Sequence, residues 1–365
     1  MTATAPPATR VALAAPESRG AWDEFVAGRS EGDILQTWAW GDVMAVAGEP
    51  PARILVRGPD GAIRGVAQAL VRPTQLGRSV LYVPHGPLWD RDAPDADDLL
   101  RLLVGSLRTL ARRDHGIVVK LDPRGDGGDA DAVRDSLLAR GLRPARHDLQ
   151  ARTTRIVDLA DGGEELRKTW DKDARNLLRR AAKEGVVTEI LRHADRAAIA
   201  TFHDLLEDTA ERKRFRSHGL EFLSALADSL APAGGWYLCL ARKDGKPIGG
   251  MVTFRVADRA FYLYGASSRD PELKNANAGY ATMGATMEAL AADGVRTLDL
   301  WGVAESDDAA PDSWAGFSAF KRRFGGTPVR HAGTFDLVVD RFWYTIRDWP
   351  GVEYKERLSC GRDCL

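Results

Sequence analysis

The chain contains one long internal repeat, and this repeat restricts the possible folds more than any other feature of the sequence. Residues 53–147 are typical of a β-hairpin, a strand, a long helix, a strand, a helix and a strand, and residues 236–331 follow the same order. Helical sequence precedes each half. The order predicts two copies of one mixed α/β sheet with helices on both faces.

Local landmarks stand at matching places in the two halves. Each hairpin carries an Asp-Gly pair, a strong turn signal, and each long helix is followed by a glycine that suits the position after its last turn. The alternative is that common hairpin and helix-end features coincide by chance. The paired landmarks are Asp60-Gly61 and Asp244-Gly245, then Gly65 and Gly249 at equal spacing, Gly116 and Gly294, and the P-x-R-H endings at Pro144 to His147 and Pro328 to His331.

Composition indicates an ordinary globular protein. The 365 residues correspond to two domains at about 150 residues each. Hydrophobic residues make up 44%, and 51 Lys and Arg against 52 Asp and Glu give a net charge of −1 with His neutral. These values exclude a disordered chain, a collagen-like chain and a disulfide scaffold. They also exclude attachment to nucleic acid by bulk positive charge, so any RNA contact must come from local patches.

Secretion, membrane insertion and metal binding have no signal in the sequence. The N-terminus lacks a basic region followed by a long apolar core, no stretch reaches the ~18 apolar residues of a membrane span, and about the first ten residues are expected to be disordered. Cys239 lies in an apolar run and suits a core position. Cys360 and Cys364 are expected in an untethered tail, because two thiols without a histidine do not complete a zinc site. This cysteine usage fits a reducing, cytoplasmic location.

A strongly basic segment precedes the second half. One helix is expected over 164–184, because apolar residues recur there at helical spacing. Seven basic residues stand against two acidic ones between Leu166 and Lys183. The excess leaves two interpretations open, an anionic partner or a solvated helix face. The basic residues that recur on one face of the expected helix are Lys168, Lys172, Arg175 and Arg179.

The order of elements is that of acyltransferases of the GNAT type, present twice. Such enzymes hold the pyrophosphate of coenzyme A on the backbone amides of a glycine-rich turn before the main helix. This chain has NANAGYATMG and DAPDADDLL at the two corresponding places, and neither carries the paired glycines in register. The sequence therefore predicts the fold without an acetyl-CoA site, and no other cofactor is expected.

Two further segments hold candidate functional residues. Four cations lie within 212–216, after an amphipathic helix, and suit either a phosphate-bearing ligand or an exposed helix end. The short helix GFSAFKRRFGG places Phe317, Phe320 and Phe324 on one apolar face with Lys321 beside it. Lys321 is expected to sit against this aromatic wall, with a surface lysine as the alternative, while Arg322 and Arg323 face solvent.

At these residues the chain resembles the Fem aminoacyltransferases (FemABX type). The motif consists of W-G-x-x-x, a variable loop, and G-F-x-x-F-K-x-x-F-G-G. LQTWAWGDV near residue 35, YVPHGP at 82–87, T-A-E-R-x-x-F at 209–215 and YLYGAS at 262–267 are similar to further motifs of the family. The matches occur in order over about 300 residues.

The resemblance implies an α/β (α+β) fold of two tandem GNAT-like domains, with mixed sheets flanked by helices and no coiled-coil arm, as in the compact FemX-like type. The expected domains are 1–152 with 333–365 on the acceptor side, and 153–332 on the donor side. The implied reaction moves an amino acid from aminoacyl-tRNA to an amine of a peptidoglycan precursor. Transfer onto a small-molecule amine, a CoA-dependent N-acyltransferase and a non-catalytic binding protein are the alternatives.

The resemblance also implies roles for single residues. Many relatives carry a basic residue after the opening tryptophan motif, where this chain has Met44 and Ala45, which makes a small amine acceptor more credible. Lys321 corresponds to the catalytic lysine, with Phe320 shaping its pocket. The acceptor is expected at Arg212, Arg216, Tyr264, Tyr82 and Trp38, and the tRNA at Lys168, Lys172, Arg175, Arg179, Arg322 and Arg323.

Overall fold

The structure is a computed structural model that describes residues 9–74, 77–213, 217–268, 270, 273, 276–304 and 312–346, with the backbone alone for 312–315. It divides into two compact units. Unit 1 comprises the described residues up to Gln150 together with those from His331 onward, and unit 2 comprises those of Ala151–Arg330. Arg216, Cys360 and Cys364, named above, and Arg214, one of the four cations within 212–216, lie outside the described residues.

Unit 1 is built on a mixed sheet of eight strands. The order is β1-β2-β3-β4-β6-β15-β7, with β5 paired to β3, and only the β4–β6 pair is parallel. Its strands are β1 (Arg10–Leu13), β2 (Pro51–Arg57), β3 (Ile63–Pro73), β4 (Ser79–Val83), β5 (Leu88–Trp89), β6 (Gly116–Leu121), β7 (Arg143–Pro144) and β15 (Phe335–Val338). Its α-helices are α1 (Arg19–Ala27), α2 (Trp38–Val46), α3 (Ala96–Arg113), α4 (Gly128–Ala139) and α11 (Arg341–Ile346).

Unit 2 is built on a mixed sheet of seven strands. The order is β9-β10-β11-β12-β13-β8-β14, and only the β12–β13 pair is parallel. Its strands are β8 (Thr153–Asp158), β9 (Val186–Leu191), β10 (Trp236–Lys243), β11 (Lys246–Val256), β12 (Arg259–Ser267), β13 (Thr297–Gly302) and β14 (Thr327–Arg330). Its α-helices are α5 (Gly163–Thr169), α6 (Lys172–Lys183), α7 (Arg196–Lys213), α8 (Leu220–Leu230), α9 (Ala278–Ala292) and α10 (Asp312–Arg322).

The two sheets have the same order of strands, which confirms the fold predicted from the repeat. Their last strands are exchanged along the chain. β8 follows β7 of unit 1 but lies between β13 and β14 of unit 2, and β15 follows β14 of unit 2 but lies between β6 and β7 of unit 1. Unit 1 therefore takes its sheet from both ends of the described chain, whereas every strand of unit 2 comes from one continuous segment.

Several local predictions can be compared directly with the backbone. Asp244 and Gly245 have φ of 50° and 76° in the tight turn between β10 and β11, as a two-residue hairpin requires. Gly294 has φ of 79° after α9, as predicted. The prediction for Gly116 is wrong, because His115 takes the left-handed position (φ 53°) after α3 and Gly116 begins β6. Disorder of the first ten residues was also expected, but Arg10 begins β1, and residues 1–8 lie outside the described residues.

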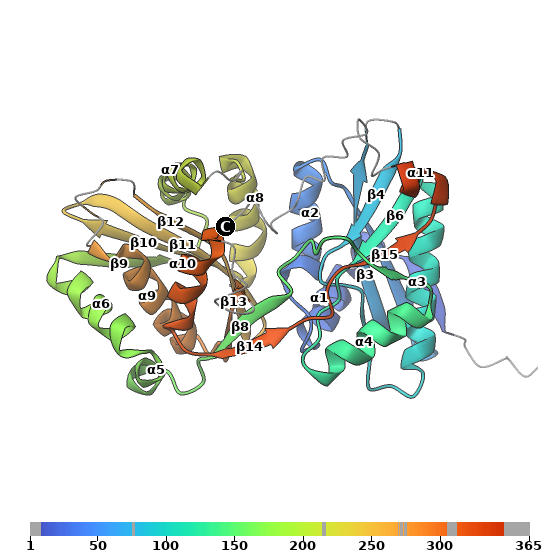
Figure 1. Cartoon of the computed structure of the whole chain (residues 1–365), viewed down its shortest axis with the longest axis horizontal. Helices are drawn as coiled ribbons and strands as arrows, with labels where there is room; N and C mark the ends of the chain where they lie inside the picture. The colour runs from blue at the N-terminus through green and yellow to red at the C-terminus, as the bar shows by residue number, and fades with distance from the viewer. Residues whose placement is uncertain are drawn as a thin grey trace, which may run out of the picture. The chain divides into compact units, whose positions relative to one another are not determined.

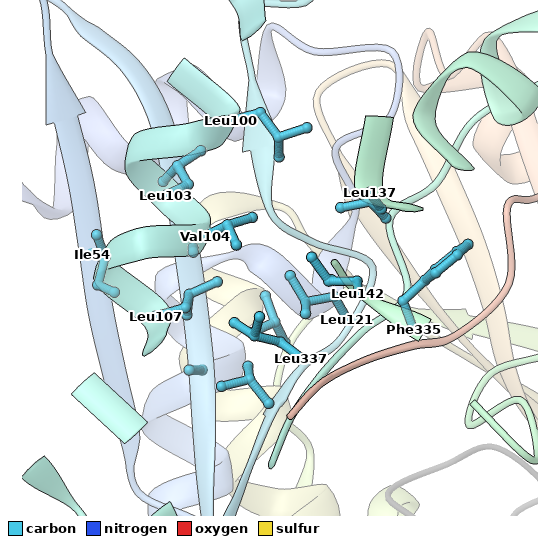
Figure 2. Close-up of a cluster of buried hydrophobic side chains, with 14 of the residues drawn as sticks. Ile54, Leu100, Leu103, Val104, Leu107, Leu121, Leu137, Leu142, Phe335 and Leu337 are labelled. Carbon is cyan, nitrogen blue, oxygen red and sulfur yellow. The ribbon is translucent and has the colours of Figure 1, made fainter. Parts of the chain in front are cut away.

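Each face of the unit 1 sheet is covered by helices. Successive residues of β2 point to opposite faces: Ile54 joins the core beneath α3, whereas Leu55 packs with Trp22 and Trp38 beneath α1 and α2. Figure 2 shows Leu103 and Leu107 of α3 facing this larger core. Strands with two buried faces give nearly continuous apolar runs, and the two covered faces agree with the prediction made from the order of elements.

The sheet of unit 2 is covered in the same way, with α7 and α9 on opposite faces (Figure 1). Met283 and Met287 of α9 pack on Cys239 of β10, which confirms the predicted core position of this cysteine. On the other face Phe202 of α7 lies so close to β11 that a Cβ at Gly250 would stand 2.6 Å from its ring. No described helix is long and apolar enough to cross a membrane.

The basic segment forms two helices, so the prediction of one helix over 164–184 is wrong. α5 ends at Thr169, Trp170 is extended, and the Asp171 side chain accepts a hydrogen bond from Ala174 N at the start of α6. An aspartate in this position favours a new helix start over continuation. Lys168 therefore lies on a different helix from Lys172.

Candidate active site

The parallel strands β12 and β13 of unit 2 separate partway along their length. They pair from Arg259–Phe261 and Thr297–Asp299, and both continue beyond this point. A register shift opposite Val252 and Thr253 marks a bulge in the β11–β12 ladder just where the separation begins. In unit 1 the corresponding strands β4 and β6 stay paired up to Val83 and Leu121. The separation is thus a feature of unit 2 and leaves its two central strands open to side chains from elsewhere.

The end of β13 is bent where it leaves β12. Trp301 has φ of 61°, a left-handed conformation that is unfavourable for a bulky residue. The ladder between β13 and β8 also shifts register between Asp299 and Gly302. The buried Asp299 carboxylate accepts hydrogen bonds from Trp301 N (2.7 Å) and from the Thr154 hydroxyl of β8. Bulges and strained residues of this kind gather at functional sites.

Helix α10 is tied to this bend by two side chains one turn apart. Ser318 and Lys321 are both fully buried. Lys321 Nζ donates a hydrogen bond to Gly302 O at 2.8 Å, and Ser318 Oγ accepts one from Ala304 N at 2.9 Å. These contacts fix the lysine at the end of β13.

The surroundings of Lys321 are largely aromatic. Its Nζ lies 3.6 Å from the centre of the Phe317 ring and 5.3 Å from that of Tyr262 on β12. Burial lowers the pKa of Lys321 well below its usual value, and the charge of Asp299 raises it in part. Because an ammonium has three donors and one is used on Gly302 O, the group can donate to a negative oxygen that develops beside it.

Phe320 belongs to a separate aromatic cluster. Its ring lies 5.1 Å from that of Tyr280 and 5.4 Å from that of Phe324, and Phe324 in turn packs on Trp170. Of the three phenylalanines in the predicted wall, Phe317 is the one whose ring faces Lys321 Nζ. A role of Phe320 in shaping the lysine's pocket stays a prediction.

Two residues predicted to bind the acceptor lie on or beside β12. Arg212, exposed near the end of α7, donates to Ser267 Oγ at 3.0 Å and to Ser268 O at 3.4 Å. Tyr264 is buried, with its ring edge-on to His218 at 6.0 Å. The structure therefore groups Arg212 and Tyr264 toward the end of β12 that lies beyond the separation from β13.

The other two described residues of this set lie in the interior of unit 1. Trp38 packs edge-on against Trp22, and the Arg53 guanidinium covers its ring at 4.0 Å. Tyr82 is fully buried, and Arg72 lies over its ring at 4.6 Å. These positions favour a structural role over direct contact with an acceptor.

The hydroxyl of Tyr82 belongs to a buried polar cluster that the sequence analysis missed. Tyr82 donates to Asp122 Oδ2 at 2.7 Å, and His85 N donates to Asp122 Oδ1 at 2.6 Å. The His85 ring contacts Asp33, which also accepts from Arg124 at 3.0 Å. Burial raises the pKa of Asp122 to about 7, whereas His85 and Arg124 hold that of Asp33 at about 2 against the effect of burial. The only signal for this cluster in the sequence was that its polar residues stand next to apolar runs.

The residues predicted to bind tRNA differ in how far they are already engaged. Lys172 is exposed, and Arg179 contacts Asn176 of its own helix. Lys168 pairs with Glu165 at 2.6 Å. The face around α6 therefore keeps cations at its surface, and Lys168 of α5 already has an acidic partner.

The remaining basic residues of the set lie on α10 and just after it. Arg323 donates to the Tyr280 hydroxyl at 2.8 Å and lies 3.6 Å from Asp173, so it is engaged rather than free in solvent. Arg322 is half-buried. Burial lowers the pKa of Arg155, and the positive charge of Arg322 lowers it further. Both side chains are thus half-buried, whereas Lys321 is fully buried.

The start of α3 in unit 1 is unsuited to a pyrophosphate. Asp95 at this end accepts a hydrogen bond from Arg64 at 2.8 Å, and Asp97 and Asp98 lie in the first turn. The backbone amides at a helix start can hold an anion, and the aspartates at the start of α3 would repel the negative charge of a pyrophosphate bound to them.

Comparisons with known proteins agree with this architecture. The sequence model described as the acetyltransferase (GNAT) domain matches residues 140–322, half of the chain. The lipid II:glycine glycyltransferase of Staphylococcus aureus (strain bovine RF122 / ET3-1) is 28% identical over 232 residues, 61% of this chain and 53% of the relative. The chain thus matches about half the length of this curated relative. The resemblance to the Fem aminoacyltransferases is confirmed.

Solved structures show the same fold. The crystal structure of FemX superposes with a TM-score of 0.80 at 20% identity, covering 92% of this chain and 99% of that one. A tandem GNAT protein from the clavulanic acid biosynthesis pathway superposes with a TM-score of 0.57 at 13% identity, covering 91% and 98%. The prediction of two tandem GNAT-like domains is confirmed.

Proposed function

We propose that this chain, which belongs to the acetyltransferase (GNAT) domain family, is an aminoacyltransferase that moves an amino acid from aminoacyl-tRNA to an amine of a peptidoglycan precursor. The observation that carries the proposal is Lys321, a fully buried lysine beside two central strands that separate, with a hydrogen bond to Gly302 O and Phe317 beside it. Similarity to a lipid II:glycine glycyltransferase supports the choice of reaction.

The reaction needs little beyond orientation and one well-placed donor. The ester of an aminoacyl-tRNA is already activated, and the acceptor amine attacks its carbonyl to give a tetrahedral intermediate with an oxyanion. The intermediate collapses by breaking the ester bond, so that the amine loses a proton, the terminal ribose oxygen of the tRNA leaves as a hydroxyl and the amide forms. Alignment of the two substrates contributes ~7–11 kcal/mol in favourable cases, and one oxyanion donor contributes ~2.7–4 kcal/mol. Lys321 supplies that donor in our proposal. Because it is fully buried, the side chains that cover it must shift when the substrates bind.

In our proposal the acceptor binds beside the far end of β12. Arg212 is exposed and fixed by Ser267 and Ser268, so its guanidinium suits an anionic group of the acceptor. We expect Arg212→Ala to raise the acceptor KM at least tenfold more than the donor KM. Arg196→Ala, which removes an exposed arginine from the other end of α7, is the control. Equal changes in both KM values would contradict this placement.

The decisive experiment is transfer of radiolabel from a total aminoacyl-tRNA pool onto candidate acceptors, with and without ribonuclease. Product that forms only with intact RNA and requires Lys321 supports the proposal. The control variant is Lys246→Met, because Lys246 is exposed on the β10–β11 hairpin. Transfer of an acyl group from coenzyme A in the absence of RNA would overturn the proposal in favour of a CoA-dependent N-acyltransferase.

The acceptor class is a separate arm of this experiment. A small-molecule amine is the second candidate, because Met44 and Ala45 stand where many relatives have a basic residue, and Met44 is buried. Lipid-linked and nucleotide-linked precursors and free small amines are therefore offered in parallel. Product on small amines alone would replace the peptidoglycan acceptor and leave the tRNA-dependent reaction in place.

A further inference from the structure

We propose that Asp299 is the positioning residue of Lys321: its carboxylate holds the bent end of β13 that presents Gly302 O to the lysine, and its negative charge favours the ammonium form of the lysine. The proposal rests on the proposed function for its meaning in catalysis. Its two parts, position and charge, have separate physical grounds and separate tests.

The positional part follows from the backbone of β13. Trp301 is left-handed, and such a conformation in a bulky residue persists only where its surroundings hold it. Asp299 Oδ1 accepts a hydrogen bond from Trp301 N at 2.7 Å, two residues along the same strand. The carbonyl of the following residue, Gly302, is the acceptor for Lys321 Nζ at 2.8 Å. The backbone of Trp301 and Gly302 therefore joins the hydrogen bond of the carboxylate to that of the lysine at the bend.

A second strand fixes the carboxylate itself. The Thr154 hydroxyl of β8 donates to the same oxygen of Asp299, across 145 residues of sequence. The ladder between β8 and β13 shifts register in this place, which leaves room for the side-chain contact. The Asp299 carboxylate is thus held from two directions in the interior of unit 2.

The charge part follows from what surrounds the lysine. Burial favours the neutral amine of Lys321, and the negative charge of Asp299 favours the ammonium. Burial also raises the pKa of Tyr262, so the ring that faces Nζ from β12 stays neutral. Arg322 and Arg323, next to Lys321 on the chain, carry positive charge and do not favour a second cation. In the described part of unit 2, Asp299 is therefore the negatively charged group that favours the ammonium form, beside the Phe317 ring and Gly302 O.

The consequence for the reaction concerns the strength of the donor. An ammonium stabilises an oxyanion more strongly than a neutral amine, because a charge-assisted hydrogen bond is about twice as strong as a neutral one. Asp299 touches no reacting atom in this scheme and acts through Lys321. Activity should then be lost as pH rises through the pKa of the folded lysine, because the protonated form is the active one.

The test of charge is independent of activity. Lysine residues labelled with ¹³C at Cε are titrated by NMR in the full chain, and the Lys321 signal is assigned by its absence from Lys321→Met. In Asp299→Asn, which keeps an oxygen for Trp301 N, we expect the Lys321 midpoint to fall by about one pH unit or more. The control is Glu221→Gln, an exposed acid on α8, which should leave the midpoint in place. An unchanged midpoint in Asp299→Asn would overturn the charge part.

The test of position uses Thr154→Val, which removes the hydroxyl and keeps the Asp299 charge. We expect kcat to fall about three- to tenfold, the effect of one hydrogen bond, with both KM values unchanged. Unchanged kcat would overturn the positional part, and this arm holds even if Asp299→Asn fails to fold.

The alkaline limb of the kcat profile links the two parts to the reaction. In Asp299→Asn this limb should move to lower pH with the NMR midpoint. If the midpoint moves while no aminoacyl transfer is found for the wild type, the proposed function fails and the charge assignment of Asp299 stands. If transfer occurs and the limb does not move, the charge of Asp299 has no role in the reaction, and the positional part is decided by Thr154→Val alone.

Discussion

At the scale of single residues, a substitution of Lys321 gives the most direct test of the proposed reaction. Lys321→Met keeps the aliphatic stem in its aromatic surroundings and removes the charge and the hydrogen bond to Gly302 O. We expect kcat to fall by ~10²–10³, the usual effect of removing one oxyanion donor, with tRNA affinity nearly unchanged. Steady-state kinetics and a tRNA binding titration check this. Loss of tRNA binding with kcat preserved at saturation would make Lys321 a docking residue.

Asp122 predicts a pH-dependent stability of unit 1. Burial raises its pKa to about 7 in the folded chain, above the ordinary value of 3.8. The folded state therefore binds the proton more tightly, and the stability from this group is present below about pH 4 and is lost as pH rises to about 7. Asp122→Asn cannot ionise and does not lose this stability as pH rises. The difference in free energy of unfolding between Asp122→Asn and the wild type should therefore shift in favour of the variant by at least ~1 kcal/mol between pH 4 and pH 8.

Asp33 of the same cluster provides a contrast of opposite sign. Its pKa is held at about 2, below the ordinary value of 3.8, so its stabilising effect is present above about pH 4 and is lost as pH falls toward 2. Asp33→Asn should accordingly lose stability at neutral pH. Denaturant titrations across the pH range measure both variants, and a parallel response of the two would refute the assignment.

At the scale of elements, α6 is the proposed surface for tRNA. Replacing Lys172, Arg175 and Arg179 by Gln should weaken tRNA binding and reduce the slope of log K against log salt by ~0.7–0.9 for each phosphate that α6 no longer neutralises. Fluorescence anisotropy over a salt series measures this slope. The matched control replaces Arg101, Arg112 and Arg113 on α3, three exposed arginines of unit 1. An equal effect of both triple variants would leave α6 as a solvated helix face.

At the scale of the whole molecule, the exchanged strands predict how the chain responds to truncation. β15 brings Asp336 to Lys120 of β6, and this buried pair joins Nζ and Oδ1 at 2.9 Å. A chain that ends at Arg330 loses β15 and leaves Lys120 buried without that partner, which costs ~3–5 kcal/mol. We expect unit 1 to unfold and unit 2 to stay folded, because all its strands remain.

Hydrogen exchange followed by mass spectrometry reads the two units separately in that truncated chain. Amides of β6 should lose protection, and those of β10, β11 and β12 should keep it. A chain that ends at Ile346 retains every described residue and is the control. Protection of β6 equal to that of the control would show that unit 1 folds without its exchanged strand.

The sequence by itself determined the features that depend on local pattern. The Asp-Gly turns, the apolar runs of covered strands and the apolar spacing of α10 each encode one element through its own residues, so the repeat of two mixed sheets was predictable. The break at Asp171 was also local, but the helical spacing on both sides of it favoured one continuous helix.

Only the tertiary structure decided which distant residues meet. The exchange of β8 and β15, the pair of Lys120 with Asp336 across 216 residues, and the contact of Thr154 with Asp299 across 145 leave no trace in local periodicity. The same holds for Lys321, whose burial depends on the bend of β13 and on the separation of β12 from β13. Spacing along the chain places a residue on a face, and only packing sets the charges and hydrogen bonds that it meets there.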